Sequence, residues 1–293
     1  MQNVLVLIAN PARPSLNDAA VRHAADTLHA AGATVGAADW LAPGIACDLP
    51  FDGPAAAVAL PGIDAVVVPA RGRRKRLLVA DMESTMIENE MLDELAAFLG
   101  LREKIAGITA RAMNGEIDFA KALFERVLLL KGLPVATLTE AASRIRYMPG
   151  GSALIATMRA NGAYCALVSG GFTFFTAIVR KQLGFDSDAA NRLEIDGDTL
   201  AGTVELPVLG KEAKIAALQK LRGERNIAIE DTLAVGDGAN DLPMLQGAGL
   251  GVAFHAKPIV ASQVAARIDH GDLTALLYLQ GYRRSQFIEE KTP

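Results

Sequence analysis

The chain has 293 residues, 51% of them hydrophobic and 21% charged, and a formal net charge of −4. This length is enough for one or two domains with a substantial core. No stretch approaches the ~18 to 20 uninterrupted apolar residues of a membrane-spanning helix, so no membrane association is expected. The charge balance also lacks the basic excess typical of nucleic-acid binding, which excludes nucleic acid as an expected partner.

Cysteine and histidine show no disulfide or zinc pattern. Cys47 and Cys165 are isolated, and two lone thiols in a chain without a secretory signal are expected to be reduced and buried. The four histidines include no HxxxH or HExxH spacing. The first apolar run, VLVLIA, lacks a basic lead and a small-residue cleavage site. We therefore expect a cytoplasmic protein.

Residues 1–70 are predicted to form a small α+β unit. A strand, an alanine-rich helix and two further strands are predicted at 3–9, 16–31, 34–38 and 64–68. The basic run that follows, residues 71–76, marks a domain boundary. It is interpreted either as a solvated linker or as a contact for phosphate or nucleic acid.

From residue 77 onward, apolar strands alternate with helical patterns. Three short apolar runs, LLVAD, ALVSG and TLAVGD, end in Asp, Ser or Gly, and helices are predicted between them at 152–161, 172–183 and 211–222. This alternation predicts an α/β fold with a doubly wound parallel sheet. Ligands bind at the carboxyl ends of such strands, so we expect Asp81, Ser169 and Asp237 to converge there.

A long helical stretch, residues 86–147, separates the first and second of these strands. It is too long for a simple crossover connection. We therefore predict a separate helical cap over the site, at about residues 90–147.

The first polar cluster is DMEST, at the end of the first strand. The Asp81 carboxylate would project into the ligand crevice and act as a nucleophile, while Glu83 would give and take protons. The same residues could instead form an Asx-type turn and a helix cap.

The second cluster is GDGAND. Asp237 and Asp241 offer the hard oxygen ligands that magnesium prefers. The alternative is a glycine-rich turn that caps the next helix. The cluster is neither a GxGxxG loop nor a Walker A motif.

Two further groups could hold a phosphoryl group. The Ser169 hydroxyl and the free amides of the following helix suit phosphoryl oxygens, although Ser169 could serve only as an N-cap. Lys211 or Lys214 could neutralise the phosphoryl charge, or either could be a solvated helical lysine.

Taken in this order and spacing, the four pieces resemble the haloacid dehalogenase superfamily over residues 77 to 280. The first motif of that superfamily is DxDx[TV]. Within it, the closest resemblance is to phosphoserine phosphatases, carried by ADMESTMIENEMLDELA, AMNGEIDFAKALFERVLLLKGLP, VSGGF, ANRLEIDGDTLAGTV, AVGDGANDLPML and AFHAKP. The resemblance implies a Rossmann-like core with a helical cap.

The resemblance also implies roles for matched residues. Asp81 would be the phosphorylated nucleophile and a magnesium ligand, and the backbone carbonyl of Glu83 and Asp237 would complete the protein ligands of the metal. The phosphoryl group would be held by Ser169, Lys214, Gly170 and Asn240. Lys214 is preferred to Lys211 because it matches the family's AK-x-x-x-L pattern.

The cap would supply the substrate end of the site. Glu90 would bind the ammonium group and Arg126 the carboxylate of serine phosphate. Met113 and Phe119 would wall the pocket or pack within the cap. The chain departs from the family at Glu83, where the family has aspartate. The extra methylene extends the acid/base group by ~1.5 Å, and a misplacement of this size can cost about a hundredfold in rate.

The implied function is magnesium-dependent hydrolysis of O-phospho-L-serine to L-serine and phosphate, the last step of serine biosynthesis. The alternatives are a phosphatase for another small phosphomonoester, or a weakened or non-catalytic amino-acid sensor. Residues 1–70 resemble an ACT-like unit of the ferredoxin-like type. That resemblance implies a homodimer and an amino-acid effector as possible partners. The sequence leaves open the effect of Glu83 and the choice between phosphoserine and phosphothreonine.

Overall fold

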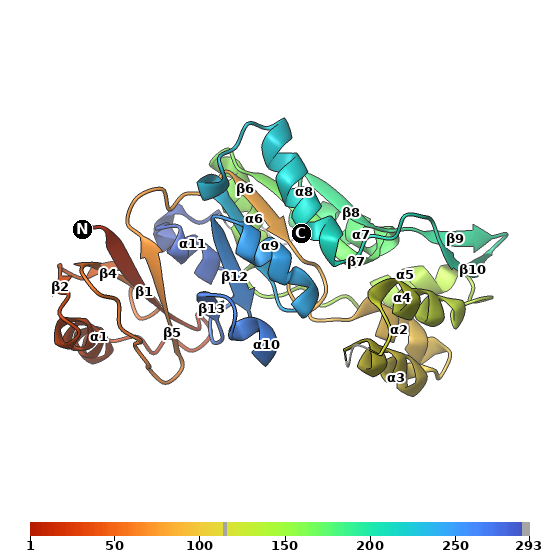
Figure 1. Cartoon of the computed structure of the whole chain (residues 1–293), viewed down its shortest axis with the longest axis horizontal. Helices are drawn as coiled ribbons and strands as arrows, with labels where there is room; N and C mark the ends of the chain where they lie inside the picture. Colours follow the sequence, from red (N-terminus) through yellow and green to blue (C-terminus); the bar gives the residue numbers. More distant parts are fainter. Residues whose placement is uncertain (114–115, 289–293) are drawn as a thin grey trace.

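The computed structural model describes residues 1–113 and 116–288. Figure 1 shows two sheets with their helices, and a group of helices at the end of the molecule away from the N-terminus. Among the described residues, no helix combines the length and apolar character needed to cross a membrane.

The first 69 residues form a unit built on an antiparallel sheet. Its elements are β1 (Asn3–Ala9), α1 (Asp18–Ala30), β2 (Thr34–Val35), β3 (Asp39–Ala42), β4 (Ala46–Asp52) and β5 (Ile63–Pro69). The strand order is β2-β4-β1-β5, with β3 also paired to β4. Because β1 occupies one edge of β4, β2 and β3 share the other edge and act as one interrupted strand.

This order and these directions are those of a ferredoxin-like unit, as predicted, but the second crossover differs. Residues 53–62 lie between β4 and β5 and form no helix. Prolines at positions 54 and 61 leave too few residues between them for a stable helix. The segment is instead extended, and its alternate residues Ala56, Val58 and Leu60 pack on the sheet.

The second sheet is parallel and doubly wound, which confirms the predicted fold class. Its strand order is β13-β12-β11-β6-β7-β8. The strands are β6 (Leu77–Ala80), β7 (Tyr164–Phe172), β8 (Ser187–Asn191), β11 (Thr232–Gly236), β12 (Leu250–Phe254) and β13 (Ala266–Ile268). The chain leaves β6 toward one edge and later returns to build the other, so the topological switch point lies between β6 and β11.

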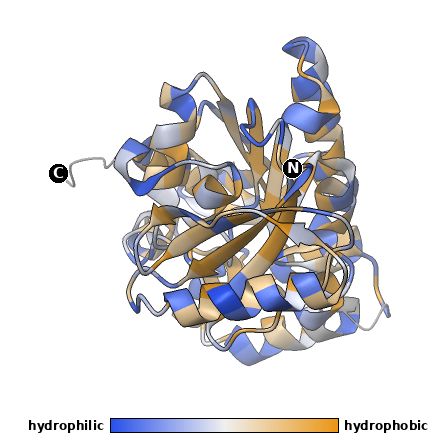
Figure 2. Cartoon of the chain, turned by 90° about the vertical axis from the view of Figure 1, so that its left-hand side faces the viewer, coloured by the Kyte–Doolittle hydropathy of each residue, from blue (hydrophilic) through white to orange (hydrophobic). Residues whose placement is uncertain are grey.

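Helices cover both faces of this sheet. One face packs against α8 (Lys211–Glu224), α9 (Leu242–Gly247) and α10 (Pro258–Ala261). The other packs against α6 (Gly151–Ala160), α7 (Thr173–Leu183) and α11 (Ala275–Leu279). The central strands β6 and β11 are buried along their whole length. In Figure 2, where the N-terminal unit faces the viewer, the strands are mostly orange while blue is concentrated on helix surfaces and loops.

The helices inserted after β6 form the cap that the sequence predicts. They are α2 (Met91–Phe98), α3 (Arg102–Met113), α4 (Phe119–Leu128) and α5 (Ala136–Ala142). The two segments that join cap and core run side by side, because the Glu88 amide donates to the Arg146 carbonyl and the Met148 amide to the Met86 carbonyl.

A hairpin that the sequence does not predict, β9 (Leu193–Asp196) and β10 (Thr199–Val204), contacts the cap. The Leu200 amide donates to Leu133 and the Gly132 amide to Leu200.

The basic run 71–76 joins the two sheets and is largely used within the fold. Arg73 pairs with Asp48 and donates to the carbonyls of Tyr278 and Leu279. Arg74 stacks on the Tyr282 ring. These contacts indicate that the run holds the N-terminal unit against the core, rather than serving as a fully solvated linker or a phosphate contact.

The two cysteines are buried and unpaired, as expected. Burial, reinforced by the Asp48 charge, raises the pKa of Cys47 to about 12. Burial also raises the pKa of Cys165. Both thiols therefore stay protonated and weakly reactive.

Candidate active site

Carboxylates from three places meet at the carboxyl ends of the central parallel strands. Asp81 follows β6, Asp237 follows β11, and Asp241 lies one turn further on. One carboxylate oxygen from each lies within 4.8 Å of the others, and all three residues are buried. The site is therefore at the switch point, where ligands of doubly wound sheets bind.

Lys214, from α8, connects two of these acids. Its Nζ lies 2.6 Å from Asp81 Oδ1 and 2.5 Å from Asp241 Oδ1, and the residue is only 1% exposed. Burial alone would lower the pKa of Lys214, but the charges of Asp81 and Asp241 outweigh it and raise the pKa. The lysine is thus a fixed cation, whereas the side chain of Lys211 is exposed and pairs with Glu212.

Asp241 serves mainly to hold this arrangement. Its second oxygen accepts the Gly238 amide at 2.9 Å. A methyl group on Gly236 would lie 2.5 Å from the Asp241 carboxyl carbon, so only glycine fits there. The sequence places Asp241 beside Asp237 but cannot reveal its partner, which lies 27 residues earlier.

Negative charge exceeds positive charge in this buried cluster. Burial and the Asp241 charge raise the pKa of Asp81 to about 8, with Lys214 opposing them. Burial likewise raises the pKa of Asp237, while the nearby Lys257 opposes the shift. Three carboxylates face one buried lysine, an excess that a divalent cation would neutralise. All the offered atoms are oxygens, the ligands that magnesium prefers, so the residues fit the predicted magnesium site.

Glu83 lies on the loop after β6 and is half-buried. Its Oε1 accepts the backbone N–H of Met91, the first residue of α2, at 2.8 Å. Withdrawal from water and then the Glu90 charge raise the pKa of Glu83 to about 8. The side chain is not one of the three carboxylates grouped around the candidate metal position.

The carboxyl end of β7, residues 169–172, is held by short polar contacts. The Ser169 hydroxyl accepts the Gly171 amide at 2.9 Å. The Gly170 carbonyl accepts from the buried Asn191 side chain at 2.8 Å, and Asn191 also accepts the Leu209 amide at 2.7 Å. Asn191 thus joins the carboxyl end of β7 to the segment before α8. Sequence reasoning missed this role, although Asn191 lies in the quoted stretch ANRLEIDG.

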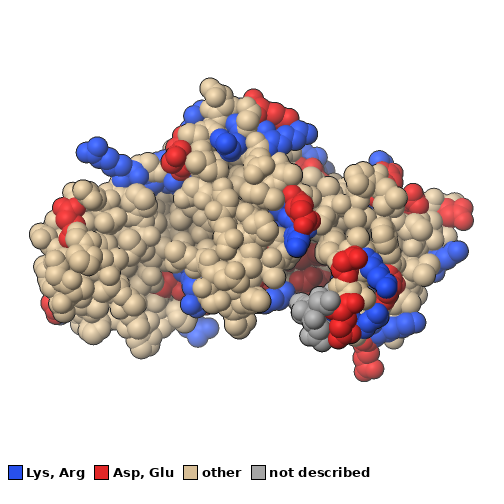
Figure 3. Space-filling model, in the orientation of Figure 1, with Lys and Arg blue, Asp and Glu red and all other residues tan. Residues whose placement is uncertain are grey.

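The cap places a cation, Arg126, and an acid, Glu90, near the loop after β6 that carries Glu83 and Ser84. Glu90 accepts the Ser84 hydroxyl at 2.7 Å. Burial lowers the pKa of Arg126, and the charges of Glu83, Asp93 and Glu90 oppose that shift. Figure 3 shows acidic side chains in the recess between the core and the cap.

Of the two expected wall residues, Phe119 does reach the core, since a methyl group on Gly170 would lie 3.3 Å from the end of its ring. The side chain of Met113 lies outside the described part of the structure.

Residues 78–246 match the profile of the haloacid dehalogenase-like hydrolase family. Since this is more than half of the chain, the protein belongs to that family.

The chain is 42% identical over 203 residues to the phosphoserine phosphatase of Lactococcus lactis, a match that covers 69% of this chain and 94% of the relative. Against three longer phosphoserine phosphatases, however, the chain spans only 52%, 55% and 63% of the relative's length.

Two solved structures extend the comparison. A haloacid dehalogenase family hydrolase from Salmonella enterica serovar Typhi superposes with a TM-score of 0.82 at 28% identity, covering 95% of this chain and 98% of the other. A phosphoserine phosphatase solved as an analogue of its phospho-aspartyl intermediate superposes with a TM-score of 0.66 at 40% identity, covering 70% and 98%. The first likeness therefore includes the N-terminal sheet, and the second is confined to about two-thirds of the chain.

Proposed function

We propose that the protein hydrolyses O-phospho-L-serine to L-serine and phosphate through an aspartyl phosphate on Asp81, with magnesium as cofactor. The observation that carries this proposal is the buried contact of Asp81 with Lys214 at the strand ends, 2.6 Å long, beneath a cap that presents Glu90 and Arg126. The likeness to a phosphoserine phosphatase in a phospho-aspartyl form supports it.

In the first step an Asp81 oxygen attacks phosphorus, and the bond between phosphorus and the seryl oxygen breaks. Glu83 gives its proton to that oxygen, which leaves as the hydroxyl of serine. In the second step Glu83 takes a proton from water, whose oxygen attacks phosphorus and frees the Asp81 carboxylate. Lys214 and the Ser169 hydroxyl stabilise the negative charge on the phosphoryl oxygens.

Magnesium would be held by Asp81, Asp237 and the backbone carbonyl of Glu83. When bound, it would neutralise charge on the phosphoryl group. Gly170 and Asn240 are proposed as further phosphate contacts.

The choice of substrate rests on the charges of the cap. Serine phosphate carries an ammonium and a carboxylate in addition to its phosphate. We propose that Glu90 binds the ammonium group and Arg126 the carboxylate. A phosphomonoester that lacks these groups would leave both charges uncompensated, which favours an amino-acid phosphate over a sugar phosphate.

The division of the chain proposed here is an N-terminal unit at 1–70, a linker at 71–76, and a core at 77–293 with its cap at about 90–147. The bounds of β5, β6 and α2 to α5 support this division. We also propose a cytoplasmic location, supported by the two unpaired thiols.

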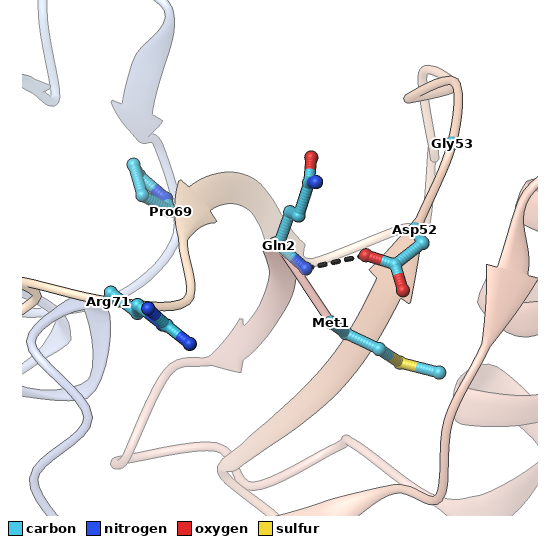
Figure 4. Close-up of a pocket in the computed structure, with 6 residues that line it drawn as sticks. All are labelled: Met1, Gln2, Asp52, Gly53, Pro69 and Arg71. Carbon is cyan, nitrogen blue, oxygen red and sulfur yellow. Dashed lines mark hydrogen bonds between the residues drawn. The ribbon is translucent and has the colours of Figure 1, made fainter.

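An amino-acid effector and a homodimer are proposed for the N-terminal unit. An open hollow of about 600 Å³ is lined by Met1, Gln2, Asp52, Gly53, Pro69 and Arg71 (Figure 4). The Asp52 carboxylate accepts the backbone N–H of Gln2 at 2.6 Å, and Arg71 is exposed. Opposite charges on one hollow suit a zwitterion, and the edge formed by β2 and β3 suits pairing with a second copy. A serine-dependent shift in melting temperature tests the proposed effector. The molecular mass in solution tests the proposed homodimer.

The deciding assay measures phosphate release from L-phosphoserine by the whole protein, with magnesium and with a chelator. Turnover is expected to need the metal and to fall by at least a thousandfold in Asp81→Asn, because the amide is a far weaker nucleophile. Substantial turnover by Asp81→Asn would contradict the proposal. Phosphothreonine and a sugar phosphate, tested in parallel, define the substrate preference. A wild-type protein that binds serine but releases no phosphate would favour the alternative of a non-catalytic amino-acid sensor.

A further inference from the structure

The amino end of the cap helix α2 is supported from the core. The amide of Met91, at the first position of this helix, has no partner within the helix. The residue before it, Glu90, makes no side-chain cap, because its carboxylate accepts the Ser84 hydroxyl instead. The Met91 amide donates to Glu83 Oε1 at 2.8 Å. A side chain of the core thus caps the first helix of the cap.

The second oxygen of the same carboxylate points to the carboxyl end of β7, which carries Ser169 and Gly171. A methyl group built on Gly171 would lie 3.0 Å from Glu83 Oε2 and 3.1 Å from Ser169 Oγ. One carboxylate therefore spans from the cap helix to the end of β7 that is proposed to hold the phosphate. An aspartate is shorter by one methylene, roughly 1.5 Å, and could not reach both ends.

We infer that the Met91 backbone amide positions the Glu83 carboxylate for proton exchange with the seryl oxygen, so that the acid/base group is in place only when α2 lies against the core. This inference rests on the proposed function. It assigns a reason for glutamate at position 83, since only the longer side chain connects the two parts. It also makes Met91 a positioning residue through its N–H rather than through its side chain.

The test compares Met91→Pro with Met91→Ala. Both variants lose the same buried side chain, but only proline removes the N–H. Proline is well tolerated at the first position of a helix, and Glu90, at φ −102° and ψ 107°, already has the extended backbone that proline requires of its predecessor. For phosphoserine, kcat of Met91→Pro is expected to be about 10- to 100-fold below that of Met91→Ala, with a similar KM.

A second substrate separates positioning from general damage. The nitrophenolate of p-nitrophenyl phosphate leaves without a proton, so the first turnover by Met91→Pro should be as fast as that by Met91→Ala. Subsequent turnovers should be slow, because water activation still needs Glu83. Equal kcat values for the two variants on phosphoserine would overturn the inference. An inactive wild type would instead overturn the proposed function.

If both Met91 variants fail to fold, Glu83→Asp and Glu83→Gln decide the question in an otherwise unchanged chain. Aspartate keeps the carboxylate but cannot reach the Met91 amide. Its kcat is therefore expected to fall most of the way to that of Glu83→Gln. Wild-type kcat in Glu83→Asp would show that the length of the side chain is not used.

Discussion

The core has two neighbours, the N-terminal unit and the cap, and the charges at the two junctions are arranged differently. At the first junction, Asp64 accepts the amides of Asp269, His270 and Gly271, and Asp48 is paired with Arg73. At the second junction, Arg126 lies near Glu83, Asp93 and Glu90, with Arg102 near Asp93 and Lys257 near Glu90. The acids of the N-terminal junction are thus bound by direct partners, whereas the Arg126 side chain at the cap donates to the Ala122 carbonyl and the Thr109 hydroxyl rather than to these acids.

Apolar packing joins the core to both neighbours. Valines of β1 and β5 share one continuous core with α11, so the N-terminal unit cannot separate from the core without exposing that surface. The same cluster includes buried residues of the cap helices α2, α4 and α5, and the cap is also joined through two adjacent segments and the hairpin β9–β10. The two junctions therefore differ in their polar contacts, which suit permanence at the first and binding and release of a charged ligand at the second.

The largest expected effect on stability is at the N-terminal junction, in Arg73→Ala. Asp48, only 6% exposed, would lose its partner, and breaking a buried pair in this way costs ~3 to 5 kcal/mol. The melting temperature should fall by roughly 10 °C. Arg76→Ala, in the same basic run but exposed, is the control and should change little. Equal melting temperatures for the two variants would contradict a permanent junction.

This loss should depend on pH in a defined direction. Burial already raises the pKa of Asp48, with Arg73 opposing it, and removing Arg73 would raise it further. An acid whose pKa is higher in the folded state destabilises the fold above its unfolded pKa of ~3.9, and the penalty shrinks as the pH falls toward that value. Thermal unfolding of Arg73→Ala at neutral pH and near pH 4 measures the difference.

At the cap, Arg126→Ala should change kinetics rather than stability. It removes the proposed partner of the substrate carboxylate, a charged contact of ~1.5 to 3 kcal/mol, so kcat/KM for phosphoserine should fall about 10- to 100-fold. Arg111→Ala is a matched control, because Arg111 lies on the same cap and pairs with Glu116 and Glu125, which are not among the proposed site residues. A loss of the same size with a substrate that has no carboxylate would rule out this role.

A feature of the structure could be predicted from the sequence where a local residue pattern marks it. The strand ends and the residues Asp81, Ser169 and Asp237 are marked by short apolar runs, and the parallel sheet follows from their alternation with helices. The contact of Lys214 with Asp241 is tertiary and has no local signal. The hairpin β9–β10 also lacks a clear local signal, because β9 is mostly exposed and the alternating burial of β10 involves only two large apolar residues, Leu200 and Val204. Likewise, nothing in the sequence around Asp64 reveals that its carboxylate binds amides more than 200 residues away.

The smallest expected effect concerns the basic run itself, in Arg74→Ala. The Arg74 guanidinium lies 3.2 Å from the centre of the Tyr282 ring, and Tyr282 is buried. An exposed cation–π contact is worth ~0.5 to 1 kcal/mol, so the melting temperature should fall by roughly 2 °C with kcat and KM unchanged. Arg74→Lys keeps the charge but stacks less well, and should lie between the wild type and Arg74→Ala. If Arg74→Ala instead impaired phosphoserine turnover at wild-type stability, the basic run would act on the substrate, and the contrast between the two junctions would fail.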